Sequence, residues 1–342
     1  MPLDVSSLLQ VHKVEAIISN DLSARDTLVE QPLVSVIITT YDRAAYLHEA
    51  LSSALNQNYR NIEVIVSNDS GPESMADVVS SFNDERVHYF RHPTNVGVAA
   101  NTLSAVRRAR GTYIAFLNDD DVWGERFLEV LVLFLESDET VAIAFSDHYI
   151  IDEHGHLNQD ATEAATKRFN RADLDPGLHR PFFDIALRTQ SVPVVMAAVM
   201  RISSLNWSDF PVEVGPSYDF WIGYLASQHN QAAYYCSERL TYYRVHPGAE
   251  TRVGRLRTSK AHIFIFREFL RDPYLASLWP HFRHEYAVAH ISHGIALLRT
   301  GLLKDARRHL RTGLHMEPSP RVALALALSW LPGSWLRCWL PS

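Results

Sequence analysis

Apolar and polar residues alternate along this chain in blocks of two lengths. Short, apolar, β-branched runs have the length of strands and cover residues 33–40, 62–69, 86–92, 112–117 and 141–152. Longer stretches have apolar residues three and four positions apart and cover residues 43–57, 72–82, 98–109 and 125–137. The first pattern predicts buried strands and the second predicts amphipathic helices. Their alternation predicts an α/β fold with a Rossmann-like, mostly parallel sheet covered by helices on both faces.

The pattern is weaker after residue 152. Residues 154–177 are polar and rich in turn formers, which favours a flexible flap. We expect a buried strand at 192–202, a helix at 218–228, and a strand followed by a loop at 232–252. From residue 258 the pattern is helical, with a hairpin at 290–319. The first 31 residues are predicted to form a leader helix.

Charge separates the chain into an acidic front and a basic end. Residues 255–342 hold 13 Lys and Arg against 5 Asp and Glu, a net charge of +8, whereas residues 1–254 carry −15. The basic end fits either a solvated helical face or a contact with anionic lipid. Residues 321–342 contain three tryptophans and much leucine, so they form either a membrane-interface segment or a last core helix.

Composition limits the compartment. The two cysteines, Cys236 and Cys338, lie far apart in the sequence, which argues against a disulfide scaffold. The first residues lack the basic and apolar blocks of a secretory signal, and no apolar run approaches the ~20 residues that span a bilayer. We therefore expect a cytoplasmic protein, in contact with the inner face of a membrane if the basic end binds lipid.

Three polar clusters follow predicted strands. They are "TTYDR" at 39–43, "SNDSG" at 67–71 and "NDDD" at 118–121. In a parallel sheet the carboxyl ends of strands share one edge, where ligands bind, so the clusters predict a pocket. Three adjacent carboxylates are usually held together by an oxygen-seeking dication such as Mg²⁺ or Mn²⁺. Capping of the next helix is the alternative, and it explains one or two of them.

At these motifs the chain resembles the family 2 glycosyltransferases, which have a GT-A fold. "VSVIITTYDR", "VIVSNDSG", "NVGVAANTLSAVRRARGTYIAFLNDDDVW" and "LTYYRVHPG" occur in the family's order over roughly residues 32–250. The resemblance implies inverting transfer from a nucleotide-diphosphate sugar with Mn²⁺ or Mg²⁺. It also implies a GT-A domain over 32–254, with a nucleotide-binding half at 32–152, an acceptor half at 153–254, and a C-terminal helical extension at 255–342.

The resemblance assigns a donor site to the first strand ends. Thr39 and Tyr41 match positions around the nucleobase, and Asp69 matches the acid that accepts a hydrogen bond from the base. Gly97 and Asn101 match the loop and helix start beneath the nucleotide. The bland alternatives are a partly buried loop aromatic for Tyr41 and a turn residue for Asp69. UDP fits this set best, with dTDP and GDP also open.

The acidic motif matches the family's Asp-x-Asp sequence with one departure. Asp120 matches the metal-binding carboxylate, Asp119 the position beside ribose and diphosphate, and Asp121 the start of the next loop, a second metal candidate. Asn118 stands where the first Asp is common, and its amide can bond a ribose hydroxyl or a metal-bound water. In the late loop, Arg244 matches a diphosphate contact and His246 a metal or phosphate contact.

An inverting transfer needs one base and no covalent nucleophile. Asp219 in "PSYDFW" is our candidate, because the family places an acid just before this helix. The family's usual Glu-Asp pair would fall on Pro216 and Ser217, so the match is imperfect and Glu213 is held in reserve. Helix capping is the alternative for both acids. Arg91 and His92, at the end of the third strand, are weaker diphosphate candidates.

The expected function is sugar transfer to a saccharide or lipid-linked acceptor, with no nucleic-acid partner. A nucleotide-sugar-binding scaffold without catalysis is the alternative, because of Asn118 and the missing Glu-Asp pair. A nucleotidyltransferase or a dinucleotide-binding dehydrogenase is disfavoured, since "TTYDRAAY" has no glycine-rich turn. A monomer and a homodimer joined through the leader or the C-terminal helices are equally compatible with the pattern.

Overall fold

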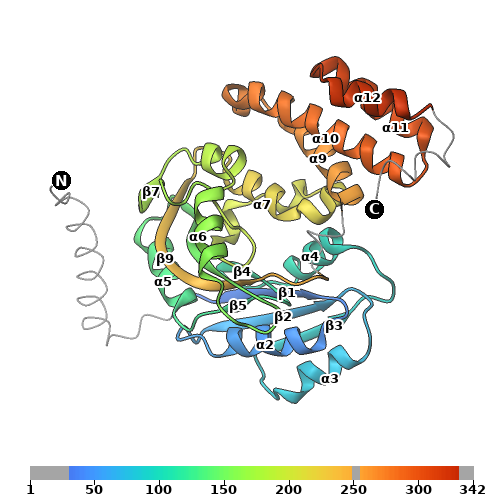
Figure 1. Cartoon of the computed structure of the whole chain (residues 1–342). Helices are drawn as coiled ribbons and strands as arrows, with labels where there is room; N and C mark the ends of the chain where they lie inside the picture. The colour runs from blue at the N-terminus through green and yellow to red at the C-terminus, as the bar shows by residue number, and fades with distance from the viewer. Residues whose placement is uncertain (1–30, 249–254, 331–342) are drawn as a thin grey trace. The chain divides into compact units, whose positions relative to one another are not determined.

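A nine-stranded sheet organises the described part of the chain (Figure 1). Its strands are β1 (Val34–Thr40), β2 (Ile62–Asn68), β3 (Val87–Arg91), β4 (Tyr113–Asn118), β5 (Val122–Trp123), β6 (Val141–Ile151), β7 (Gly177–His179), β8 (Ala198–Arg201) and β9 (Ala232–Arg244). Their order is β3-β2-β1-β4-β8-β6-β9-β5, and β7 pairs with β9. This is a computed structural model that describes residues 31–248 and 255–330. The predicted leader helix, residues 249–254 and the tail from residue 331 lie outside the described residues.

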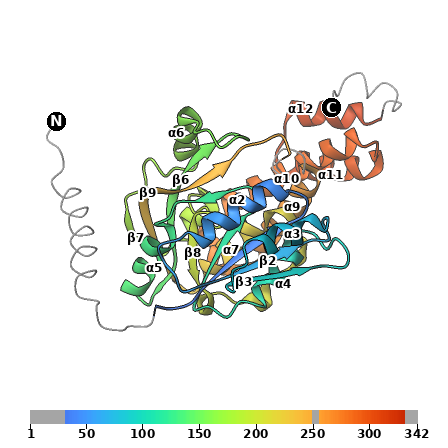
Figure 2. The same ribbon diagram turned by 90° about the horizontal axis from the view of Figure 1, so that it is seen from below.

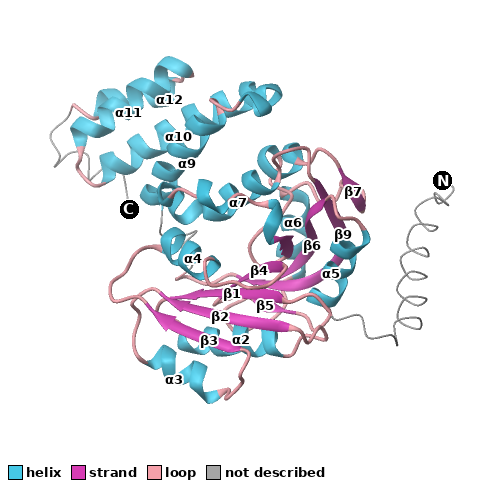
Figure 3. Ribbon diagram, turned by 180° about the vertical axis from the view of Figure 1, so that it is seen from behind, coloured by secondary structure: helices cyan, strands magenta, loops and turns pink. Residues whose placement is uncertain are grey.

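Helices cover both faces of the sheet, as the alternation predicted. They are α2 (Ala44–Leu55), α3 (Ser74–Ser81), α4 (Val98–Val106), α5 (Phe127–Ser137), α6 (Gln159–Arg168), α7 (Tyr218–Ala226), α9 (Arg255–Phe269), α10 (Trp279–Arg299), α11 (Leu303–Met316) and α12 (Pro320–Leu328). Helices α2 and α3 lie on one face of the parallel strands and α4 lies on the other (Figures 2 and 3). The short helical segments are the π-helix η1 (Asp184–Arg188) and the 3₁₀-helices η2 (Ile202–Ser204), η3 (Trp207–Asp209), η4 (Val212–Ser217) and η5 (Pro273–Leu278).

The sheet has a parallel half and a mixed half. Strands β3, β2, β1 and β4 pair in parallel, as do β6 and β9, whereas β8 runs antiparallel to both its neighbours and β5 and β7 run antiparallel to β9. The α/β class is confirmed, and the parallel character holds mainly for the first half. In the register, Thr39 lies beside Ser67 on one side and Asn118 on the other. The three polar clusters therefore leave the sheet at one edge.

The strand predicted at 192–202 is shorter in the structure, where β8 begins at Ala198. Pro193 has no N–H to donate to a neighbouring strand, and Met196 takes a positive φ of 81°. The buried apolar residues before β8 therefore belong to a loop that packs against the core rather than to the sheet. Apolar character alone did not separate these two environments.

The flexible flap predicted at 154–177 is wrong, because this segment contains helix α6. The helix is capped by the Asn158 side chain, which accepts a hydrogen bond from the backbone N–H of Ala161 at 2.9 Å. The inner face of α6 buries Thr162 and Thr166 rather than large apolar side chains. A helix whose buried face is made of hydroxyl residues has little hydrophobic periodicity, so the sequence pattern missed it.

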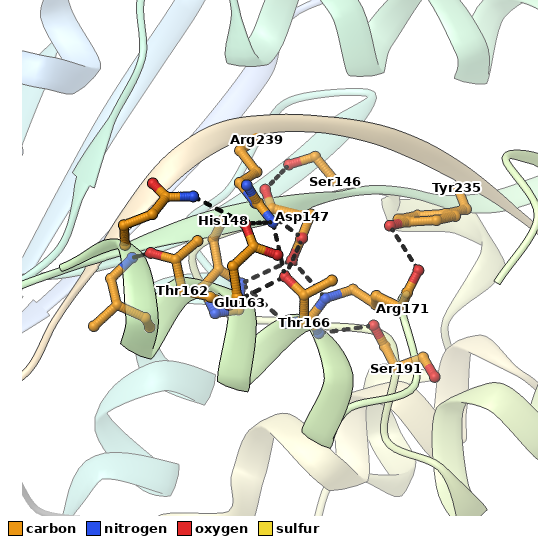
Figure 4. Close-up of polar contacts among 12 residues, drawn as sticks. Ser146, Asp147, His148, Thr162, Glu163, Thr166, Arg171, Ser191, Tyr235 and Arg239 are labelled. Carbon is orange, nitrogen blue, oxygen red and sulfur yellow. Dashed lines mark hydrogen bonds and ion pairs between the residues drawn. The ribbon is translucent and has the colours of Figure 1, made fainter. Parts of the chain in front are cut away.

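An ionic group that we name the Asp147 cluster anchors α6 to the sheet (Figure 4). It consists of Asp147, Glu163, Thr166, Arg171 and Arg239. The two carboxylate oxygens of Asp147 accept from Arg171 Nε at 2.7 Å and from Thr166 Oγ1 at 2.6 Å, and Arg239 Nε lies 3.3 Å from the second. Asp147 and Arg171 are both buried, so β6, β9 and the chain after α6 are held together by paired charges.

The C-terminal helices belong to two apolar groups. Helix α9 and the start of α10 share the main core, where Phe269 stacks on Trp221 of α7 at 5.9 Å between ring centroids. The end of α10, α11 and α12 form a second cluster around Leu298, Leu310 and Val322. The helical hairpin predicted at 290–319 is present as α10 and α11. Across residues 31–248 and 255–330, no helix combines the length and apolarity needed to cross a bilayer.

Candidate functional site

Two strand-end loops touch through a glycine. A Cβ atom on Gly71 would lie 1.4 Å from the backbone oxygen of Tyr41, so no other residue fits without moving the loop after β1. The backbone N–H of Gly71 also donates to Asn68 Oδ1 at 2.6 Å. Tyr41 keeps 51% of its surface exposed beside this contact. Its ring is thus free of the core and available to a flat ligand.

Asp69 shapes the loop before α4. Its two carboxylate oxygens accept hydrogen bonds from the backbone N–H of Val96 at 2.7 Å and of Gly97 at 2.9 Å. Gly97 precedes the helix with a φ of 83°, a conformation that favours glycine. Each carboxylate oxygen has a second lone pair, so Asp69 can hold the loop and still accept a bond from a ligand.

Asn101, predicted to contact the nucleotide, faces the sheet instead. Its side chain is buried and is bonded twice to Ser67: Nδ2 donates to the Ser67 backbone oxygen at 3.0 Å, and Oδ1 accepts from the Ser67 hydroxyl. These bonds fix α4 on β2 and leave the amide turned away from the strand-end edge. We correct the prediction, because Asn101 supports the site from beneath.

We name Asp119, Asp120 and Asp121 the aspartate cluster, and Asp119 is its buried member. Arg43 Nε lies 3.4 Å from Asp119 Oδ1, whereas Asp119 Oδ2 has no hydrogen-bond partner within the described ranges. Burial raises the pKa of the Asp119 carboxyl to about 6, although the attraction of Arg43 opposes this. A buried carboxylate oxygen without a partner is costly unless a ligand supplies one.

Asp121 ties strand ends together. Its carboxylate accepts from Asn118 Nδ2 at 2.8 Å and from the backbone N–H of Arg244 at 2.9 Å, and it is 1% exposed. Burial and the neighbouring charge of Asp120 raise the pKa of Asp121 well above its usual range. Both carboxylate oxygens of Asp121 hold protein groups that join β4 to β9, and its assignment as a metal ligand stays a prediction.

Asp120 lies against both Arg43 and His246. Arg43 forms an ion pair with Asp120 Oδ2, and His246 Nε2 lies 3.0 Å from the same oxygen. Burial alone would lower the pKa of Arg43, but the charges of Asp119 and Asp120 raise it. In the protein alone, a guanidinium therefore supplies the positive charge that the aspartate cluster requires. Sequence reasoning missed Arg43, although it stands in the "TTYDR" cluster.

A dication fits two of the three predicted metal ligands. Two neighbouring ligands of an octahedral ion with bonds of about 2.1 Å lie about 3 Å apart, which matches the spacing of Asp120 and His246. Within the described residues, no group of three or more His, Cys, Asp or Glu side chains could hold a metal ion by itself. The residues present therefore suit an ion that takes its remaining ligands from a substrate and water, as Mg²⁺ commonly does.

Arg244, predicted to bind a diphosphate, is buried and already engaged. Its Nε donates to the backbone oxygen of Asp120 at 2.8 Å, and its outer nitrogen forms an ion pair with Glu49. Its guanidinium also lies 4.7 Å from the Tyr46 ring centroid. We correct the prediction: Arg244 fixes the backbone of the aspartate cluster and has no open face toward a ligand.

Tyr218 connects the aspartate cluster to the start of α7. Its hydroxyl lies 3.4 Å from Asn118 Oδ1, and burial followed by the charges of Asp219 and Asp120 raises the pKa of Tyr218. Asp219, the next residue, is exposed to solvent at the first turn of α7. Surrounding protein raises the pKa of Asp219, and backbone N–H groups oppose this; because the residue keeps an exposed surface, solvent screens the effect.

The remaining candidate site residues have different environments in the structure. Arg91 Nε donates to the backbone oxygen of Gly71 at 2.8 Å, so it supports a strand-end loop. His92 has a buried ring nitrogen without a partner among residues 31–248 and 255–330. Glu213 is exposed in η4. Thr39 is the penultimate residue of β1 and lies beside Asn118. Thr39, Tyr41, Asp69, the aspartate cluster and His246 therefore lie at one strand edge, and Asp219 follows Tyr218, which reaches Asn118 at that edge.

Comparison of sequences connects this edge with sugar transfer. A family model described as glycosyl transferase family 2 matches residues 35–192. An uncharacterised glycosyltransferase of Rickettsia felis is 27% identical over 75% of this chain and 40% of its own length. The UDP-Glc:alpha-D-GlcNAc-diphosphoundecaprenol beta-1,3-glucosyltransferase WfaP of Escherichia coli is 34% identical over 34% of this chain. The match spans 47% of WfaP, less than half of that enzyme.

Solved structures share the fold. S. aureus TarS 1–349 in complex with UDP-GlcNAc superposes with a TM-score of 0.58 and 16% identity, over 89% of this chain and 87% of that one. The mannosyltransferase PcManGT of Pyrobaculum calidifontis, in complex with GDP-Man and Mn²⁺, gives a TM-score of 0.54 and 18% identity, over 98% and 89% of the two chains. At these identities the likeness establishes the architecture.

Proposed function

This chain belongs to glycosyl transferase family 2, and from that premise we propose that it transfers a sugar from a UDP-sugar to an acceptor hydroxyl with inversion. The observation that carries the proposal is the aspartate cluster, which joins an unpartnered buried oxygen of Asp119 to the cation-binding carboxylate of Asp120. TarS binds UDP-GlcNAc on the same fold, which supports a UDP-sugar donor. The strand-end edge is the proposed donor site.

The nucleoside would lie against the loops after β1 and β2. Tyr41 offers an exposed aromatic face to the base, and Asp69 offers a free lone pair to a ring N–H. Thr39 and Asn118 are paired near the ends of neighbouring strands and would supply a hydroxyl and an amide toward the ribose. Gly97 lets the backbone approach closely, since a Cβ there would meet no atom within 4 Å in the described structure.

The diphosphate would lie against the aspartate cluster. Asp120 and His246 would hold Mn²⁺ or Mg²⁺, which when bound offsets the negative charge on a leaving diphosphate. Asp119 would remain ionised beside them, above its pKa of about 6. Arg43 is 32% exposed at its side chain and can turn from the carboxylates to phosphate oxygens. The Arg43 guanidinium would then form its ion pair with the donor diphosphate instead of with the aspartate cluster.

Asp219 is the proposed base. Its carboxylate would accept the proton of the acceptor hydroxyl while the acceptor oxygen bonds to the anomeric carbon and the bond from that carbon to the diphosphate breaks. One displacement of this kind inverts the anomeric configuration. The contact of the Tyr218 hydroxyl with Asn118 Oδ1, next to the aspartate cluster, supports this assignment, because Asp219 follows Tyr218 at the start of α7.

We further propose that the protein works at the cytoplasmic face of a membrane on a lipid-linked or polysaccharide acceptor. WfaP, a relative over one third of this chain, is described as acting on a diphosphoundecaprenol substrate. Lys304, Arg308 and Arg311 are exposed on α11, and nearby Leu324 is 60% and Trp330 62% exposed. Basic and apolar side chains on one surface favour anionic lipid. A homodimer remains a prediction, and light scattering would test it by measuring the molar mass in solution.

The test is turnover of UDP-sugars with Mn²⁺ and with EDTA, comparing the wild type with Asp219→Asn and Glu213→Gln. We expect EDTA to abolish transfer, and Asp219→Asn to lower kcat by about 10²–10⁴-fold without changing UDP binding. Glu213→Gln is the matched control and should stay near wild type. Tight UDP binding with no transfer to any acceptor would instead favour the scaffold interpretation. Activity indifferent to both EDTA and Asp219→Asn would contradict the mechanism.

A further inference from the structure

A groove of about 440 Å³ runs between α9 and α10, outside the strand-end edge. These helices lie against each other (Figures 1 and 3). The groove is lined by side chains from both helices: Arg255, Thr258, Ser259 and His262 of α9, and Glu285, Val288, Ala289, Ser292, Ile295, Ala296 and Arg299 of α10. The donor site described above uses none of them.

One end of the groove is positively charged. Arg255 begins α9 and Arg299 ends α10, and both line the groove and are exposed. Among residues 31–248 and 255–330, neither guanidinium forms an ion pair, whereas Arg267 and Arg271 on the same segment pair with Glu268. Two unpaired guanidinium groups in one groove suit phosphate or diphosphate oxygens, which they bind with paired N–H donors.

The rest of the groove combines an apolar strip on α10 with polar side chains, namely three hydroxyl residues, His262 and Glu285. Val288 is 37% exposed, and Ile295 and Ala296 continue the same surface of α10 toward Arg299. From Glu285 to Arg299 the helix rises about 21 Å. The apolar strip of α10 that ends in two cations is complementary to an aliphatic chain that carries a phosphate head group. A nucleotide or a free saccharide would leave this apolar surface uncovered.

Three observations connect α9 and the groove with the proposed active site. His262, which lines the groove, packs edge-on against Phe220, the residue after Asp219, with 6.5 Å between ring centroids. Arg255 follows His246 by nine residues, so the charged end is a short chain distance from the metal candidate. On α9, Ala261 contacts the η4 turn, since a Cβ on Gly215 would lie 3.9 Å from its methyl group.

We propose that the α9–α10 groove binds the phosphate group and the adjoining aliphatic chain of a lipid-linked acceptor. Arg255 and Arg299 hold the phosphate oxygens, and Val288, Ile295 and Ala296 cover the chain. The sugar that carries the acceptor hydroxyl then extends toward Asp219 at the start of α7. This assignment rests on the proposed sugar transfer and specifies its acceptor site, which is separate from the donor site.

The probe is farnesyl diphosphate, titrated into the full-length protein by calorimetry below its aggregation concentration. We expect Arg255→Ala/Arg299→Ala to weaken its binding about tenfold or more, because both guanidinium partners are lost. The control, Lys260→Ala/Arg283→Ala, removes the same charge from the same two helices at exposed positions outside the groove. It should bind like the wild type. Equal weakening by both double variants, or no binding by the wild type, would overturn the proposal.

A second variant tests the apolar part. Ser292→Trp places a large side chain in the groove from an exposed position and should weaken farnesyl diphosphate but not inorganic diphosphate. If both ligands bind equally well to the wild type and Ser292→Trp changes neither, the groove is only an anion site and the proposal fails. It also fails if the arginine variant loses phosphatidylglycerol vesicles and keeps farnesyl diphosphate, since the arginines would then serve the bilayer surface.

Two controls separate this proposal from the proposed function. UDP binding and thermal stability should be unchanged in all three variants, which shows that the donor site and the fold are intact. If the wild type transfers no sugar but binds farnesyl diphosphate through the two arginines, the sugar-transfer proposal fails and the groove assignment stands. If transfer proceeds with a lipid-linked acceptor at the same KM in wild type and Arg255→Ala/Arg299→Ala, only the groove assignment fails.

Discussion

The aspartate cluster and the Asp147 cluster are both buried groups of carboxylates and arginines, yet they differ in balance. Each carboxylate oxygen of Asp147 accepts a short hydrogen bond, and the carboxylate lies against the guanidinium groups of Arg171 and Arg239. Asp119 leaves one oxygen unpartnered in the described structure, and Asp119 and Asp120 share the partly exposed Arg43. Burial raises the pKa of Asp119, whereas for Asp147 the neighbouring Arg171 and Thr166 outweigh burial and lower the pKa.

This difference separates a structural ion group from a ligand site. A buried carboxylate with all its partners stabilises one arrangement of the chain, and loss of a partner is costly. A cluster with surplus negative charge is costly in the protein alone and becomes favourable when a cation or a donor–metal complex arrives. The same residue types therefore anchor α6 in one place and are proposed to bind the donor in the other.

The largest expected effect is on stability, at Asp147. Asp147→Ala should lower the free energy of unfolding by about 3–5 kcal/mol, because Arg171 would remain buried without its counter-charge. Urea unfolding followed by circular dichroism measures this. Glu163→Ala is the control, since its contact with Arg239 is half exposed and should contribute less than about 1 kcal/mol. Equal losses for the two variants would remove the contrast drawn above.

Within the aspartate cluster, substitution of Asp121 should lower the stability of the fold, whereas substitution of Asp120 should leave it almost unchanged. Asp121→Asn presents an amide to the Asn118 side chain and the Arg244 backbone N–H, and should cost about 1–3 kcal/mol of stability. Asp120→Asn removes one of three like charges and should leave the stability of the free protein within about 0.5 kcal/mol. Urea midpoints at pH 7.5 compare them. A larger loss at Asp120 would mean that this carboxylate is structural.

Arg43 should matter for the donor more than for the fold. Arg43→Ala is expected to weaken UDP binding about tenfold, because a charge-assisted contact with the diphosphate is lost. Calorimetry at fixed Mn²⁺ measures the change, and Arg126→Ala, an exposed arginine paired with Glu238, serves as the control. Unchanged UDP affinity in Arg43→Ala would confine Arg43 to neutralising the aspartates.

The last expected effect is the pH dependence of stability. Burial, followed by the charge of Arg171, lowers the pKa of His148 from 6.5 to about 3 in the folded chain. The unfolded state therefore binds one more proton between these pH values, so stability falls as pH drops below about 6.5. The slope for one such group is about 1 kcal/mol per pH unit. Urea midpoints from pH 7.5 to 5 measure it, and His148→Gln should flatten the curve.

The sequence pattern predicted an element correctly where its buried residues are apolar and follow the spacing of a strand or a helix. Strands β1, β2 and β4 are mainly apolar, are buried over most of their length and end in unlike polar residues, so their positions and the shared edge were predicted correctly. The pattern failed at α6, whose buried face is Thr162 and Thr166, and before β8, where a loop rather than a strand fills the core. Both failures come from side chains whose burial depends on partners distant in sequence.

For the site, position was easier to predict than orientation. Asp69, the aspartate cluster and His246 lie at one edge of the sheet, and their roles in binding stay predictions. The family motif did not show that Arg244 turns toward Glu49 or that Asn101 turns toward Ser67, because side-chain direction depends on hydrogen bonds between separate strands and helices. Arg43 had a usable signal, since a cation within four residues of Thr39 is what three carboxylates at the same edge need.

UDP binding by calorimetry, with Mn²⁺ and with EDTA, in the wild type and in Asp120→Asn, tests the central claim most directly. The account predicts that Mn²⁺ strengthens UDP binding at least about tenfold in the wild type and leaves it unchanged in Asp120→Asn, because the cation bridges this carboxylate and the diphosphate. Equal UDP affinity in all four conditions would contradict the claim that the aspartate cluster is the donor site.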